Sequence, residues 1–338
     1  MKADEARPSA RWWEKVFVGI LLTSAVVYAR CARGELACPQ LVEGVKSAQS
    51  SLSNASSSPK ILQALARIYM AQGQFEKAET LVDKALNAVA YKEEAAEEKS
   101  SYLIDLAWVY KNQGRFAKAE EVCRLGLQLQ QQLYYKDHPY IAYTLRILGS
   151  IYQAQAKYPQ AHESLDNALL IIRKCHLPDD PVVASFEVDV ARLLVAEGKF
   201  VQAETIYQRA YLLISEHYGP EHLYTAGVLA DIAKLYFLQG KLDLAEQMLT
   251  LALPIQEQVY ADNHQAIVSN RLTLVQIYQA KGDLPHAEQL LIKTLAAIEA
   301  KPGYEYPLKS EILACLAAMY LETEGFARAE IPQLYPGG

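Results

Sequence analysis

The sequence of 338 residues is poor in the residues that mark several protein classes. Its 16 glycines and 14 prolines are too few for a turn-rich all-β protein or a collagen-like chain. Five cysteines over this length do not make a disulfide scaffold. With 33 basic against 39 acidic residues, the chain lacks the basic excess by which general nucleic-acid binders contact phosphates. We therefore expect no nucleic acid among its partners.

Motifs for catalysis, metals and cofactors are also missing. The sequence contains no His-Glu-x-x-His or Cys-x-x-Cys spacing, no Gly-x-Ser-x-Gly turn and no glycine-rich phosphate loop. Cysteines 123, 175 and 315 are far apart and are interpreted as inert helix residues. We expect a protein that is not an enzyme and that has no metal, cofactor or small-molecule substrate.

An uncharged apolar run lies near the amino terminus, at residues 16–29. A helix of this length spans about 21 Å, less than the ~30 Å core of a bilayer. The stretch 12–32 is long enough if the charges at its ends reach the interface, and Trp12 and Trp13 lie where an aromatic belt would. We interpret residues 16–32 as a transmembrane anchor. A signal segment cleaved after Ala29 is the alternative.

Basic residues flank this run unequally. Four precede it and two follow it: Lys2, Arg7, Arg11 and Lys15, then Arg30 and Arg33. This asymmetry predicts a single-pass protein with its amino terminus inside and its remainder on the extracytoplasmic, periplasmic side. If the segment is cleaved, the protein is instead soluble and periplasmic or secreted. Residues 1–15 form a charged flank, and residues 33–58 a serine-rich linker.

An eleven-residue motif then occurs seven times, at intervals of 41 or 42 residues. Its first copy reads Tyr69-Met-Ala-Gln-Gly73-Gln-Phe75-Glu-Lys-Ala78-Glu79. The later copies begin at Tyr110, Tyr152, Leu194, Tyr236, Tyr278 and Tyr320. Such regular spacing indicates an array of equivalent structural units.

Each unit has the pattern of two helices. Apolar residues seven, four and three positions before the motif form a helical stripe, as at Leu62, Leu65 and Ala66. The glycine four residues into the motif suits a helix end, and a second amphipathic stretch follows it. We therefore predict antiparallel helix pairs with turns near Gly73, Gly114, Ala156, Gly198, Gly240, Gly282 and Glu324. His138, His222 and His264 share one position of the unit, so they are interpreted as helix-entry turn residues.

The repeated unit resembles the tetratricopeptide repeat (TPR). The matching residues in the first copy are Leu62, Leu65, Ala66, Tyr69, Gly73, Phe75, Ala78 and Ala85. The 42-residue period and the loops at 136–139 and 219–222 resemble the repeats of kinesin light chains and related bacterial arrays. The resemblance covers about residues 59–331. It implies an all-α, right-handed solenoid of about seven repeats, with a groove lined by the first helices and with other proteins as partners.

The resemblance also indicates where a partner would bind. In this family an asparagine five residues before the motif often binds a peptide backbone, but no copy here has asparagine there. Candidate groove residues are Arg67, Asp105, Trp108, Arg146, Asp189, Arg192, Asp231 and Lys234. Asp189 with Arg192, and Asp231 with Lys234, are spaced to form intrahelical ion pairs or a mixed-charge strip for a polar partner. Trp108 would anchor an apolar partner side chain or pack on the linker.

The carboxyl-terminal end suggests a second surface. Pro332 prevents the second helix of the seventh unit from continuing, so residues 332–338 form a short tail. The last apolar face should stay partly uncovered unless the tail folds over it. The candidate docking patch is Leu313, Leu316, Tyr320 and Leu321. Together these features predict a non-catalytic protein-interaction scaffold that assembles or stabilises a membrane-associated complex. The alternative is a soluble binding protein that captures a peptide or ligand.

Overall fold

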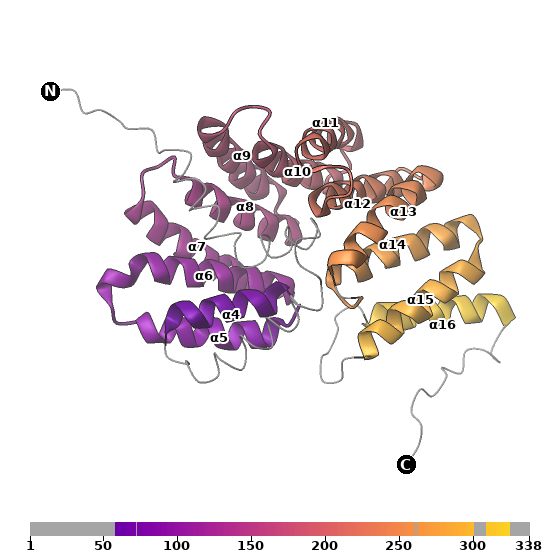
Figure 1. Ribbon diagram of the computed structural model, residues 1–338, viewed down its shortest axis with the longest axis horizontal. Helices are drawn as coiled ribbons and strands as arrows, with labels where there is room; N and C mark the ends of the chain where they lie inside the picture. Colours follow the sequence, from indigo (N-terminus) through magenta and orange to yellow (C-terminus); the bar gives the residue numbers. More distant parts are fainter. Residues whose placement is uncertain (1–57, 72, 261, 301–308, 325–338) are drawn as a thin grey trace, which may run out of the picture. The chain divides into compact units, whose positions relative to one another are not determined.

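The computed structural model describes residues 58–71, 73–260, 262–300 and 309–324 (Figure 1). All regular elements in these ranges are helical: thirteen α-helices and one short 3₁₀ helix, η1 (Glu93–Ala95). The predicted anchor, most of the linker and the tail lie outside the described residues. None of the helices in these ranges combines the length and the apolar character needed to cross a bilayer.

The helices alternate as the motif predicts. The first helices of the repeats are α4 (Pro59–Ala71), α6 (Ala96–Asn112), α8 (Pro139–Ala154), α10 (Pro181–Ala196), α12 (Leu223–Leu238), α14 (Gln265–Lys281) and α16 (Lys309–Glu324). The second helices are α5 (Phe75–Val89), α7 (Phe116–Leu133), α9 (Tyr158–Cys175), α11 (Phe200–Tyr218), α13 (Leu242–Val259) and α15 (Leu284–Glu299). A second helix of the seventh repeat would lie outside the described residues.

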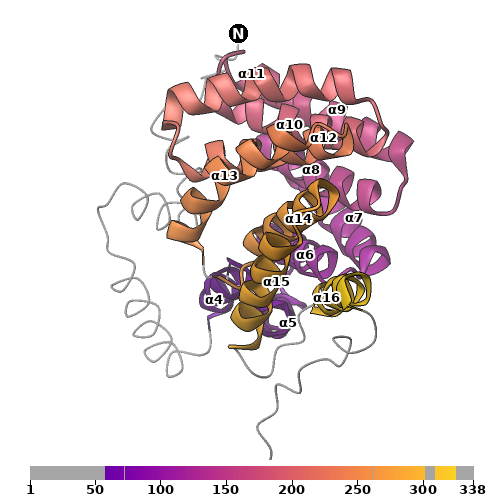
Figure 2. The same cartoon turned by 90° about the vertical axis from the view of Figure 1, so that its right-hand side faces the viewer.

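The chain forms two compact units, which are described separately. Unit 1 ends at Ala156 and its described part holds α4 to α8; unit 2 begins at Lys157 and holds α9 to α16. Within each unit consecutive helices pack against each other, as α14, α15 and α16 do in unit 2 (Figure 2). First helices of successive repeats also contact each other, for example α10 with α12 and α12 with α14. Second helices do not approach each other as closely, so the first helices line the inner face of each unit.

Small residues allow the helices of a repeat to approach closely. The motif alanines are completely buried at every described copy: Ala78, Ala119, Ala161, Ala203, Ala245 and Ala287. Larger apolar residues fill the space on either side of them. In the last described repeats, Leu272, Leu291 and Leu295 belong to one core cluster. Burying each such leucine contributes about 2 kcal/mol, so most of the stability comes from these contacts between helices.

The turns between paired helices use a left-handed residue. Gly73, Gly114, Gly198, Gly240 and Gly282 have φ between 72° and 79°, and Ala156 takes the same place with φ 57°. Glycine has no Cβ to clash in this conformation, whereas alanine costs roughly 1 kcal/mol there. The predicted turns are confirmed at these six positions. The seventh, at Glu324, coincides with the end of α16.

Candidate protein-interaction surface

The three equivalent histidines begin helices. His138, His222 and His264 are the N-cap residues of α8, α12 and α14. Each accepts, through Nδ1, a hydrogen bond of 3.2 Å from the backbone N–H two residues later. Asp180 fills the same position before α10 and accepts from Val182 at 2.7 Å. These contacts confirm the interpretation of the histidines as helix-entry residues.

An aromatic ring holds each of these histidines. A tyrosine four residues earlier stacks its ring on the imidazole, with ring centroids 3.9 to 4.8 Å apart. These tyrosines are Tyr134, Tyr218 and Tyr260. Burial lowers the pKa of His138, against a smaller opposing effect of Glu97, and lowers the pKa of His264 to about 4. A neutral ring is what the cap requires, because a protonated Nδ1 could not accept a hydrogen bond.

The described residues hold no group of three or more His, Cys, Asp or Glu arranged for a metal ion. Cys123 is buried, and desolvation raises the pKa of its thiol to about 12. Cys175 and Cys315 are partly buried in unit 2. A thiol that stays protonated is a poor nucleophile and a poor ligand, so the chemistry of Cys123 is that of a small apolar residue.

The inner face of unit 2 carries an ion-pair network centred on Arg192. Its Nη1 donates to Oδ1 of Asp189 on the same helix at 2.7 Å, and its Nη2 donates to Oδ2 of Asp231 on α12 at 2.7 Å. The Arg192 side chain is 43% exposed, whereas those of Asp189 and Asp231 are 12% and 19% exposed. Burial lowers the pKa of Arg192, but the two carboxylates outweigh it and raise the pKa above its usual value. The arginine is therefore charged and fixed in orientation.

This network confirms one predicted ion pair and corrects the other. Asp189 and Arg192 pair within α10 as their spacing predicts. The prediction that Asp231 pairs with Lys234 was wrong, because Arg192 reaches Asp231 across the contact between α10 and α12. Lys234 is exposed and makes no ion pair with any described residue.

Unit 1 has a comparable contact between α4 and α6. Arg67 Nε donates to Oδ2 of Asp105 at 3.0 Å, and Gln63 Nε2 donates to the same oxygen at 2.6 Å. The side chains of Arg67 and Asp105 are 22% and 13% exposed. Burial raises the pKa of Asp105 even though Arg67 and Gln63 oppose it. This pair is less accessible than Arg192 and mainly joins the two helices.

Two other candidate residues of unit 1 have different surroundings. Trp108 is partly buried and contacts Phe75 edge-on, with ring centroids 5.8 Å apart. Phe75 belongs to the core, so ordinary packing holds part of the Trp108 side chain. The linker on which Trp108 could also pack lies outside the described residues. Arg146 is partly buried on α8.

The predicted carboxyl-terminal patch is only partly described. Leu316 is 8% exposed and belongs to the core cluster of α14, α15 and α16. Leu313 and Tyr320 are partly buried against that cluster. The Leu321 side chain and the tail lie outside the described residues, so an open docking patch stays a prediction. A polar substitution at Leu316 would perturb the core as well as any docking.

Sequence reasoning missed a glycine on the inner face of unit 2. Gly227 lies in the second turn of α12, and a Cβ atom added to it would meet no described atom within 4 Å. By contrast, a Cβ on Gly126 of α7 would lie 3.1 Å from Ile104 Cγ1, so that glycine permits close packing. The helical register offered the signal, because residue 227 shares a face with residues 231 and 234.

These residues belong to one partly exposed strip, here called the α12 face. It consists of Tyr224, Gly227, Asp231, Lys234 and Leu238, spaced three or four residues apart. Tyr224 is 40% and Leu238 47% exposed, although both are large and apolar. Arg192 of α10 lies beside this strip through its bond to Asp231. The α12 face thus combines apolar ends, charged groups and a gap in side-chain cover.

Comparison with solved structures finds the same fold. The structure of NprR in complex with its cognate peptide NprX matches with a TM-score of 0.63 and 14% identity, over 94% of this chain and 87% of that one. A Rap protein complexed with Competence and Sporulation Factor matches with a TM-score of 0.59 and 15% identity, over 83% and 80%. BtubC (BKLC) from P. vanneervenii matches with a TM-score of 0.50 and 22% identity, over 70% and 94%.

Comparison with family models identifies the repeats directly. A tetratricopeptide repeat model matches residues 58–132, and a model described as the MalT-like TPR region matches residues 136–322. No curated protein matches the chain. The second model covers more than half of the sequence, including the turns from Ala156 onward and the buried alanines from Ala161 onward. The chain therefore belongs to the TPR proteins with a MalT-like TPR region.

Proposed function

We propose that this protein is a non-catalytic scaffold that binds an extended segment of another protein on the α12 face. The observation that carries the proposal is Gly227. A glycine inside a helix costs about 0.5–1 kcal/mol relative to alanine. Gly126 offsets that cost by close packing, but around Gly227 no described residue lies close enough to require the absence of a side chain. Its use is explained if a bound backbone approaches α12 closely at this point.

The polar groups beside Gly227 suit a polypeptide backbone. An extended segment presents both N–H donors and C=O acceptors. Arg192 and Lys234 supply donors at equivalent positions of successive first helices, and Asp231 supplies a carboxylate between them. Because Arg192 is held by two carboxylates before any ligand arrives, binding loses less side-chain entropy. Tyr224 and Leu238 would contact apolar side chains at the two ends of the strip.

The comparisons support this kind of partner. NprR and the Rap protein share the fold, and their structures were solved with a cognate peptide and with Competence and Sporulation Factor, respectively. At 14% and 15% identity these proteins share only the fold with this chain. The segment bound here therefore has to be found by experiment.

A photocrosslinking amino acid placed at Leu238 tests the proposal in cells of the native source. It should label specific polypeptides that the same group at Leu212 does not label, because Leu212 is 65% exposed on the second helix α11. Gly227→Leu should abolish the labelling by filling the gap, while leaving the helical circular dichroism unchanged. Identical labelling from both positions, or labelling that survives Gly227→Leu, would show that the α12 face is not the binding surface.

We also propose that residues 16–32 tether the repeats to a membrane, on its extracytoplasmic side, within a larger complex. The apolar run, the tryptophan pair and the excess of basic residues before the run support this. Resistance to carbonate extraction would favour the anchor, and recovery in the soluble fraction would favour cleavage. Protease added to intact spheroplasts should digest the repeats; full protection that is lost on lysis would reverse the orientation.

A further inference from the structure

Equivalent positions differ chemically at the junctions where a second helix packs on the next first helix. Each of these contacts contains two pairs of residues, and in each pair one residue comes from the second helix and one from the next first helix. From one junction to the next, each of these positions lies 42 residues further along the chain. We call them the junction residues. They are Gln130, Gln131, Thr144 and Leu145 for α7–α8; Ile172, Arg173, Phe186 and Glu187 for α9–α10; Ile214, Ser215, Val228 and Leu229 for α11–α12; and Gln256, Glu257, Asn270 and Arg271 for α13–α14.

The α9–α10 junction buries an acid where other repeats have leucine. Glu187 is 5% exposed, and its counterparts are Leu145 and Leu229. Its Oε1 accepts from Arg173 Nη2 at 2.8 Å and from Arg209 Nη1 at 3.0 Å. A buried carboxylate needs such partners, because removing it from water without them is costly.

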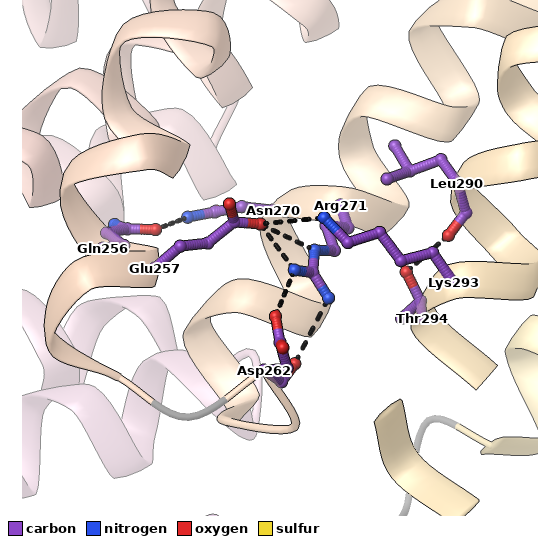
Figure 3. A network of polar contacts seen from close by, with 8 residues as sticks. All are labelled: Gln256, Glu257, Asp262, Asn270, Arg271, Leu290, Lys293 and Thr294. Carbon is purple, nitrogen blue, oxygen red and sulfur yellow. Dashed lines mark hydrogen bonds and ion pairs between the residues drawn. The ribbon is translucent and has the colours of Figure 1, made fainter. Parts of the chain in front are cut away.

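The α13–α14 junction has the opposite charges at the same positions (Figure 3). Arg271 is completely buried, and its Nε donates to Oε1 of Glu257 at 3.1 Å. Its Nη2 donates to Oδ1 of Asp262 at 2.6 Å, and Lys293 Nζ lies 3.8 Å from the same Glu257 oxygen. Arg173 is equivalent to Glu257, and Glu187 is equivalent to Arg271, because the residues of each pair are 84 positions, or two repeats, apart. At both positions the sign of the charge is therefore opposite in the two junctions.

The neighbouring pair of junction residues, one position earlier on each helix, varies as well. Gln256 accepts a hydrogen bond of 2.7 Å from Asn270, and Gln130 accepts one of 2.8 Å from Thr144. At α9–α10 the same positions hold the buried apolar residues Ile172 and Phe186. At α11–α12 they hold Ile214 and Val228, which share one core cluster. Each of the four junctions therefore has its own combination of charged, polar and apolar partners.

We propose that the junction residues specify the order in which the repeats stack. The left-handed turns and buried alanines recur in the first six repeats, so they cannot distinguish a correct neighbour from a wrong one. If α13 packed on α10, Glu257 would be buried beside Glu187. If α9 packed on α14, Arg173 would be buried beside Arg271. Each error places two like charges side by side at a buried position and removes the oppositely charged partner on the neighbouring helix, so the correct order is favoured over skipped repeats and over exchange between chains.

Charge reversal in the full-length protein tests this inference, which does not depend on the proposed function. The double variant Arg173→Glu/Glu187→Arg keeps an opposite-charge pair but gives α9–α10 the same signs as α13–α14. The single variant Glu187→Arg should lower the melting temperature, and the double variant should recover part of that loss, because Arg209 still lies beside the introduced arginine. After unfolding and refolding, however, the double variant should regain less of its starting species than wild type, measured by size exclusion with light scattering. The shortfall should grow with protein concentration.

A second variant separates order from stability. Arg173→Leu/Glu187→Leu replaces the pair by apolar residues, which often leaves stability unchanged or higher. It should melt no lower than wild type and still refold with a smaller yield of the starting species. If both double variants refold with the wild-type yield at every concentration, the junction residues only stabilise the fold and the inference is wrong. If the charge-reversed protein does not fold, the leucine variant decides alone.

Discussion

Acidification is expected to destabilise the junction between α13 and α14 through His264. Its neutral ring accepts from Ala266 N–H at 3.2 Å and stacks on Tyr260, and burial lowers its pKa from 6.5 to about 4. As the pH falls, the unfolded chain therefore takes up a proton first. Stability is intact above about pH 6.5 and is lost progressively as the pH falls toward 4. With these two pKa values, the loss at pH 5 is about 2 kcal/mol.

The chain supplies a matched variant, because Asp180 caps α10 from the same position. In His264→Asp the carboxylate stays an acceptor at pH 5. Denaturant unfolding followed by circular dichroism at pH 7.5 and 5 gives the free energy of unfolding for each protein. The decrease should be smaller by about 2 kcal/mol in His264→Asp than in wild type. His217→Gln, on the exposed side of α11, is the control and should keep the wild-type decrease. Equal pH dependence in wild type and His264→Asp would refute the reasoning.

The same unfolding assay at pH 7.5 checks the remaining predictions. Gly227→Ala should raise the free energy of unfolding by about 0.5–1 kcal/mol, because the added Cβ meets no atom. Gly126→Ala should lower it, because its Cβ would lie 3.1 Å from Ile104 Cγ1. Ala156→Gly should raise it by about 1 kcal/mol by relieving the positive φ. Arg192→Met should lower it by about 1–3 kcal/mol, because two carboxylates lose their partner. A change of the opposite sign would contradict the argument for that residue.

The helices and their turns follow from local patterns in the sequence. The stripe at Leu62, Leu65 and Ala66 has helical spacing, and Gly73 adopts the left-handed turn that its position predicts. The histidine turns were predictable for the same reason, because a cap bonds a backbone group only two residues away. Such interactions join residues that are only a few positions apart in the sequence, and the periodic pattern shows which residues these are.

Contacts between repeats are where sequence reasoning failed. The spacing of Asp231 and Lys234 favours an ion pair within a helix, but Arg192, 39 residues before Asp231, takes the carboxylate instead. Periodicity specifies which face of a helix a residue occupies, but not which helix of the next repeat that face meets. The roles of Glu187 and Arg271 were missed for a related reason, because in a single repeat each only interrupts the leucine stripe.

The length of α12 sets how long a bound segment has to be. Its 16 residues rise about 24 Å along the axis, and Tyr224 and Leu238 lie about 21 Å apart along it. An extended polypeptide advances about 3.3 Å per residue. A ligand that touches both apolar ends while crossing Gly227 therefore needs about seven residues. Shorter peptides can occupy one end only, so affinity should rise stepwise when a ligand becomes long enough to reach the second.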